Sequence, residues 1–164
     1  MICTSCITIC MAFTLALEGC ASVAQGPAFS QARAQTQPAD KAVVYVFRKY
    51  AEPTAWGATV HFGKSEIATL NQGGFTWAYV SPGRLTVRAV WAGLSGQKDS
   101  NVEISIQPGK TYYLELLGVS RMTGYSAGMI YTTMGSGLNE LGGAAAEPTI
   151  AQCCKFQKPT SINY

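Results

Sequence analysis

The residues best suited to hydrolytic chemistry surround the only histidine of the chain, His61. A hydrolytic triad needs a nucleophile, a base and an acid that orients the base. Ser65, Asp99 and Ser100 could supply the other two groups, but none of them lies in a catalytic sequence motif. We therefore predict that no residue is catalytic and that the protein is not an enzyme, and we keep a small hydrolase as an alternative.

Three cysteines near the start of the chain have a spacing that invites a metal site. Cys3, Cys6 and Cys10 could ligate zinc or an iron–sulfur cluster. The stretch is apolar, however, and the sequence offers no second cluster of ligands beside it. We predict no metal and no cofactor, and we interpret these cysteines as small apolar residues of a segment that is later removed.

Cys153 and Cys154 are adjacent near the other end of the chain. Outside the cytoplasm such thiols can oxidise. A bond between neighbours is strained, which leaves pairing with another chain as one interpretation. Two tail thiols without a role are the alternative.

Aromatic residues provide the candidate binding residues, which are Trp56, Trp77 and Tyr79. With Phe75 and Trp91 they could form a platform for a glycan or a peptide. Aromatics that alternate with small residues in a sandwich also pack in the core. Burial of Trp77 and Trp91 would argue against the platform.

The start of the chain has the pattern of an export signal. The apolar run 7–17 has the length of a secretory core and is shorter than the about 20 residues that span a bilayer. Leu17-Glu18-Gly19-Cys20 resembles the bacterial lipobox, which implies cleavage before Cys20 and fatty acylation of its thiol. Glu18 stands where a small neutral residue is usual, so a plain secretion signal, an uncleaved anchor and a cytoplasmic protein remain alternatives.

The residues after Cys20 indicate where the chain is held. In the lipoproteins it resembles, Asp after the cysteine retains the protein at the inner membrane, so Ala21 implies the periplasmic face of the outer membrane. Residues 21–40 are rich in Ala, Gln, Ser and Pro and show no period, which predicts a flexible coil with a reach of roughly 25 Å. We predict a signal peptide over residues 1–19 and a tether over residues 20–40.

From Lys41 onward, β-branched and aromatic runs alternate with Gly and Pro turns. Residues 43–47 predict a strand buried on both faces, and residues 85–91 predict a half-buried one. Short turns favour antiparallel neighbours, and sheets with one apolar face favour two packed layers. We predict an all-β, antiparallel two-layer β-sandwich, immunoglobulin- or transthyretin-like, over residues 41–134. A small barrel is the alternative, and residues 135–164 are predicted to be a loose Gly/Ala-rich tail.

Four motifs in this region carry a resemblance to a known family. They are Tyr45-Val46-Phe47-Arg48, Gly73-Gly74-Phe75, Ser81-Pro82-Gly83 and the stretch from Pro108 to Tyr113. In this order they resemble an uncharacterised family of bacterial envelope lipoproteins, a domain of unknown function similar in style to PEGA-type β-sandwich modules. The resemblance covers residues 41–118 and implies a β-sandwich, with no catalytic residue to carry over.

Charge and composition narrow the expected partners. The net charge of +3 comes from scattered basic residues, which does not predict nucleic-acid binding. We expect an outer-membrane-anchored periplasmic lipoprotein that acts as a non-enzymatic binding or scaffolding module. It would contact the membrane through its lipid, and envelope proteins or peptidoglycan and other glycans as partners. A small envelope hydrolase and a structural subunit of a secretion or envelope complex are the alternatives, and a long exposed apolar edge strand would favour the subunit.

Overall fold

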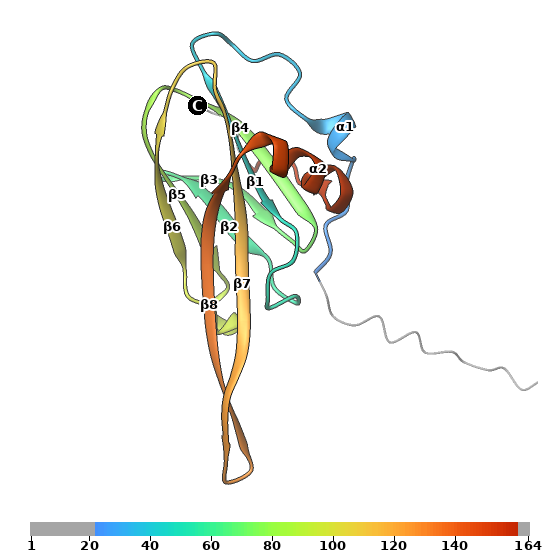
Figure 1. Cartoon of the computed structure of the whole chain (residues 1–164), viewed down its shortest axis with the longest axis vertical. Helices are drawn as coiled ribbons and strands as arrows, with labels where there is room; N and C mark the ends of the chain where they lie inside the picture. Colours follow the sequence, from blue (N-terminus) through green and yellow to red (C-terminus); the bar gives the residue numbers. More distant parts are fainter. Residues whose placement is uncertain (1–21, 161–164) are drawn as a thin grey trace, which may run out of the picture.

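The computed structural model describes residues 22–160, so the predicted signal peptide and Cys20 lie outside the described residues. Two β-sheets pack face to face, with two helices beside one of them (Figure 1). The strands are β1 (Ala42–Arg48), β2 (Ala58–Phe62), β3 (Ser65–Leu70), β4 (Gly74–Val80), β5 (Gly83–Trp91), β6 (Ser100–Ile106), β7 (Thr111–Ser126), β8 (Met129–Leu141) and β9 (Lys155–Phe156). The helices are α1 (Phe29–Ala32), the 3-10 helix η1 (Gly93–Ser95) and α2 (Gly143–Cys153). The predicted all-β sandwich is confirmed.

The larger sheet has five strands in the order β8-β7-β1-β4-β9. Every residue of β1 is buried, as its continuous apolar run predicts, because the second sheet covers one face and the helices cover the other. β1 is antiparallel to β4 but parallel to β7, and β9 is parallel to β4. The expectation of antiparallel neighbours throughout is therefore wrong for this sheet. The long intervening chain lets β7 return in the same direction as β1.

The smaller sheet has four antiparallel strands in the order β3-β2-β5-β6. In β5, Val87, Ala89 and Trp91 are buried whereas Thr86 and Arg88 are exposed, which confirms the predicted alternation. The buried faces of the two sheets meet in one continuous core. Its larger members are Val44, Val46, Val60, Phe62, Ile67, Leu70, Val80, Val87, Trp91, Ile104, Ile106, Leu114, Leu116 and Leu138.

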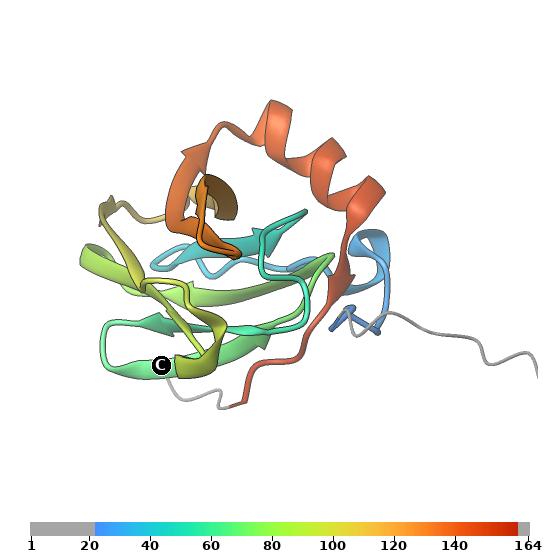
Figure 2. The same ribbon diagram turned by 90° about the horizontal axis from the view of Figure 1, so that it is seen from below.

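A second cluster covers the outer face of the larger sheet. Figure 2 shows α2 lying along this sheet on the side away from the smaller one. The cluster consists of Phe29, Val43, Tyr45, Phe47, Phe75, Tyr113, Ala146, Ile150 and Cys154. It explains why β1 needs apolar residues on both faces.

Two expectations about the ends of the domain are wrong for the described residues. Ser22 N donates to the Thr54 carbonyl and Ala24 N to the Gln72 carbonyl, and Phe29 is buried, so residues 22–32 are docked and are no free tether. Residues 135–156 complete β8 and form α2 and β9 in place of a loose tail. The composition of these segments did not predict their structure. One buried aromatic residue anchors residues 22–32, and the alanines of residues 135–156 favour a helix.

The hairpin of β7 and β8 is longer than the sandwich. It continues past the end of the sandwich as a two-stranded ribbon (Figure 1). We call residues 119–134 the arm. Its turn lies at Ala127 and Gly128, both at positive φ, which is the backbone of a tight hairpin turn.

Candidate interaction surface

Of the residues of the hydrolytic hypothesis, the structure brings only Ser65 close to His61, because Ser65 pairs with Phe62 in the β2–β3 hairpin. His61 is half-buried in β2, where its register partners are Glu66 and Arg88. Asp99 accepts a hydrogen bond from the Trp91 amide at 3.2 Å. Ser100 lies 8% exposed in β6 and accepts a hydrogen bond from another serine. These groups take part in separate structural contacts, and nothing in the geometry favours the hydrolase.

The aromatic residues do not form a common platform either. Trp91 is 4% exposed, in the core between the sheets. Trp77 is half-buried and its Nε1 donates to the Ala32 carbonyl at 2.6 Å, and the Tyr79 hydroxyl donates to the Thr36 carbonyl at 2.5 Å. Trp77 and Tyr79 therefore hold the N-terminal segment on the sheet.

The charge in the interior of the domain is that of Arg48. Its side chain is fully buried, and its guanidinium donates to four carbonyls, those of Ala51, Pro53, Trp56 and Leu70, at 2.6–3.0 Å. Burial lowers the pKa of Arg48 to about 10, so the group stays charged at neutral pH. The sequence pattern marks Arg48 as the polar end of a strand and gives no signal of this role, because its acceptors are all backbone atoms.

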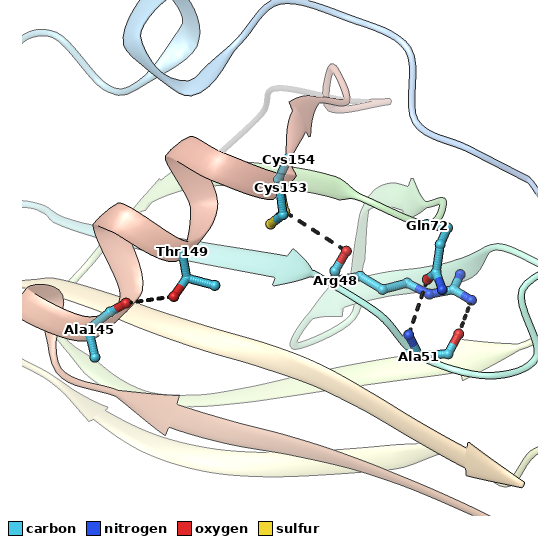
Figure 3. Close-up of a disulfide and its surroundings, with 7 residues drawn as sticks. All are labelled: Arg48, Ala51, Gln72, Ala145, Thr149, Cys153 and Cys154. Atoms are coloured by element: carbon cyan, nitrogen blue, oxygen red, sulfur yellow. Dashed lines mark hydrogen bonds between the residues drawn. A yellow bond between two sulfur atoms is a disulfide. The ribbon is translucent and has the colours of Figure 1, made fainter.

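Arg48 organises the loop 49–57, which lies at the end of the sandwich where the arm leaves it. Figure 3 shows its guanidinium beside Ala51, whose amide in turn donates to the Gln72 side chain at 3.1 Å. The same loop meets β7, since Glu52 N donates to the Gly118 carbonyl at 2.9 Å. The loop is therefore fixed both to the core and to the base of the arm.

Cys153 and Cys154 are bonded to each other (Figure 3). Cys154 is buried, with its sulfur 3.9 Å from the Arg48 carbonyl, whereas Cys153 is half-buried. The interpretation that they bond another chain is therefore not what the structure shows. The pair lies where α2 joins β9.

A polar cavity of about 270 Å³ lies beside the N-terminal segment. Tyr113 donates to Glu147 at 2.6 Å, and the Tyr45 hydroxyl accepts from the Ala34 amide at 2.9 Å. Burial, and then the bond to Glu147, raise the pKa of Tyr113, and burial raises that of Tyr45. Both hydroxyls thus remain protonated at neutral pH and serve to hold α2 and the N-terminal segment.

The exposed large apolar side chains gather at one end of the sandwich. At this end, Arg48 of β1 pairs with Gly74 of β4, and Ala58 of β2 pairs with Trp91 of β5. The loop 49–57 joins β1 to β2, so the connections that follow β1, β3 and β5 all lie at the same end of the sandwich. We call it the arm end. Among the described residues, the exposed large apolar side chains are Val23, Tyr50, Trp56, Leu94, Val119, Met122, Tyr125, Met129, Ile130 and Tyr131. The first four lie in the segments at the arm end, and the other six lie on the arm.

The arm carries exposed apolar side chains on both faces. Tyr125 pairs with Ile130 on one face. Met129 and Tyr131, the neighbours of Ile130 in β8, lie on the other face, because successive residues of a strand point to opposite sides. Tyr125 is 71% exposed and Met122 is 69% exposed. Arg121 is the only charged residue between positions 119 and 134. Contiguous exposed apolar surface of this kind marks an interaction site.

Within residues 22–160, no further strand pairs with the backbone edges of the arm. β8 is the outermost strand of its sheet, and β1 meets β7 only as far as Glu115. Gln97 donates to the Val119 carbonyl at 3.1 Å, at the base of the arm. A two-stranded hairpin alone is marginally stable in water, which makes the arm an element suited to a partner.

No family model, curated protein or solved structure matches the chain. Within residues 22–160 no helix is long and apolar enough to cross a membrane. The same residues bring no three metal-ligating side chains together. The apolar arm is the most distinctive feature of the candidate interaction surface.

Proposed function

We propose that the chain is a lipid-anchored envelope protein whose sandwich is a non-enzymatic scaffold for the arm. Acylation of Cys20 would hold the domain on the periplasmic face of the outer membrane. The arm would then be the element that makes contacts, and the sandwich would fix its position. The observation that carries this proposal is the concentration of exposed apolar residues on the arm and at the arm end.

The docking of the N-terminal segment supports a close attachment. Only Ala21 separates Cys20 from Ser22, whose amide and carbonyl are bonded to Thr54 and Gln72. Two residues span at most about 7 Å. A lipid on Cys20 would thus keep the arm end near the bilayer, with little of the freedom of a long tether.

Palmitate labelling of the full chain in a bacterial host tests the anchor. We expect the wild type to incorporate label and to fractionate with the outer membrane, and Cys20→Ser to lose both. Cys153→Ser is the matched control, which removes a cysteine elsewhere and should leave labelling unchanged. Absence of label from the wild type would remove the anchor from the proposal.

A structural subunit of an envelope complex is the second candidate function. The observation that favours it is the outer edge of β8, which is unpaired and carries no Lys or Arg between Met129 and Leu141. Such an edge can accept a strand from another chain. Sedimentation of the purified protein should reveal a defined oligomer if this is its role.

A further inference from the structure

We propose that the arm and the arm end dock on the lipid bilayer itself, with the tip of the arm in the interfacial region. The inference rests on the proposed anchor only for the orientation of the domain. All residues of the proposed contact surface belong to the described part of the chain. The bilayer is the partner that the arm would contact.

The exposed apolar residues of this surface come from several separate segments, which one partner surface must cover together. Four of these side chains come from three segments at the arm end, which are the N-terminal segment (Val23), the loop 49–57 (Tyr50 and Trp56) and the connection between β5 and β6 (Leu94). The arm projects from that same end (Figure 1). A second copy that paired along β8 would cover the arm but would leave these four side chains in water. A bilayer surface can cover both the arm and these four side chains.

The N-terminal segment is attached beside the base of the arm. Ser22, the first described residue, is bonded to Thr54, and the loop that contains Thr54 is bonded to β7 at Gly118. The chain toward Cys20 and the arm therefore begin at one loop. A lipid on Cys20 would bring the arm to the bilayer without any reorientation of the domain.

The side chains of the arm have the chemistry of a membrane interface. Tyr125 and Tyr131 have apolar rings and polar hydroxyls, which suit the boundary between headgroups and acyl chains. Met122, Met129 and Ile130 supply apolar surface around them. No acidic residue lies between positions 116 and 139 to be repelled by anionic headgroups.

Basic residues flank this surface. Arg121 on the arm is exposed, as are Lys49 and Lys98 in the connections at the arm end. The same connections contain two acidic side chains, Glu52 and Asp99, which accept hydrogen bonds from Tyr50 and the Trp91 amide. The three basic residues outnumber these two carboxylates, so the net flanking charge is positive and complements an anionic membrane surface.

The unpaired edges limit how deep the arm can go. Backbone groups without partners are costly in hydrocarbon, so a two-stranded ribbon stays where water and headgroups reach it. From Val119 to Ser126 the arm extends about 25 Å at a strand rise of about 3.3 Å per residue. It must therefore lie at an angle to the bilayer and not along its normal.

Vesicle flotation of the unlipidated mature chain tests the inference. The protein would begin at position 20 and carry Cys20→Ser, which keeps every described residue and removes the lipid. We expect it to float with vesicles of phosphatidylethanolamine and phosphatidylglycerol, and less with phosphatidylcholine alone. Tyr125→Ser/Ile130→Ser should lower the partition coefficient by about tenfold or more, because two apolar side chains leave the contact.

Two controls keep the result interpretable. Tyr125→Phe/Ile130→Val keeps the apolar surface and should float like its parent, and thermal unfolding should show that all three proteins are folded. In a Trp56→Phe background, which removes the native tryptophan of the proposed contact, Tyr125→Trp should shift its emission to the blue with vesicles. In the same background Gln107→Trp, in the turn between β6 and β7 at the other end of the sandwich, should not.

The outcomes separate this inference from the proposed anchor. No flotation of the parent, or equal flotation of the serine variant, overturns bilayer docking even if Cys20 is labelled with palmitate. Flotation with an unlabelled Cys20 keeps the docking and removes the anchor. A third result is a parent that forms a stable oligomer without lipid and fails to float, while the serine variant is a monomer. That result would assign the arm to a second copy and also overturn the inference.

Discussion

The guanidinium carbon of Arg48 lies 4.8 Å from the centroid of the Trp91 ring. The two residues come from different sheets, since β1 belongs to the five-stranded sheet and β5 to the four-stranded one. A cation over an aromatic face is attracted by the ring quadrupole, more so when both are buried. The contact therefore joins the layers at the arm end and removes Trp91 from any binding platform.

Replacement of Arg48 should unfold much of this end. Arg48→Met leaves four carbonyls without their donor, and we expect a loss of about 3–5 kcal/mol in the free energy of unfolding. Urea unfolding measures it. Arg88→Met, at an exposed position of β5, is the control and should change stability by less than about 0.5 kcal/mol. Equal stability of the two variants would contradict the role assigned to Arg48.

Truncation of Phe29 should destabilise the domain, because its ring packs 5.5 Å from Phe75 and 5.8 Å from Tyr45. We expect Phe29→Ala to lower the free energy of unfolding by about 3 kcal/mol. Ser30→Ala, at the exposed position next to it, should have almost no effect. A tether that was free in solution would make the two variants alike, which differential scanning calorimetry would show.

Gly118 sets the point at which the arm leaves the sandwich. A Cβ there would meet the Glu52 carbonyl oxygen, so Gly118→Ala must displace the loop from β7. We expect a cost of about 1–3 kcal/mol and faster hydrogen exchange in residues 49–57. Gly137→Ala is the matched control, because nothing lies within 4 Å of its Cβ. Similar exchange in both variants would argue against this contact.

Stability should fall in alkali through Tyr113. Burial and the bond to Glu147 raise the pKa of Tyr113 above its usual value near 10. Above pH 10 the unfolded chain loses this proton first, so the folded state binds more protons and the free energy of unfolding decreases as pH rises. Tyr113→Phe should show a shallower decrease between about pH 9 and pH 11, which urea titrations at several pH values would measure. An unchanged slope would exclude Tyr113 as its source.

Reduction should open the bond between Cys153 and Cys154. We expect the intact mass to rise by two hydrogens and maleimide to react with Cys153 before the buried Cys154. The ring that the bond closes is very small, so its loss should cost less than the about 2–4 kcal/mol typical of disulfides. The protein would begin at position 20 and carry Cys20→Ser, so that Cys153 and Cys154 are its only cysteines. A disulfide-linked dimer on a non-reducing gel would then show that they bond another chain.

Local patterns of the sequence were enough to predict the sandwich. Complete burial of β1 and the alternation in β5 follow from which residues repeat at period two, and the Pro108-Gly109 turn follows from a glycine at positive φ. The alternation and the turn depend on near neighbours in the chain. The burial of β1 was predicted from its apolar run, and the second sheet and the helices supply the cover on its two faces.

The candidate surface depends on contacts that only the tertiary structure supplies. Met122, Tyr125 and Ile130 are ordinary strand residues in the sequence. They become an exposed arm because β1 pairs with β7 only as far as Glu115 and no other described strand pairs with the arm. Arg48 gains its role from carbonyls up to 22 residues away. By itself the sequence determined where strands and turns lie from β1 to the start of β7, because those follow from side-chain alternation and turn residues. The tertiary structure decided which apolar faces stay uncovered, because burial depends on which segments meet in space.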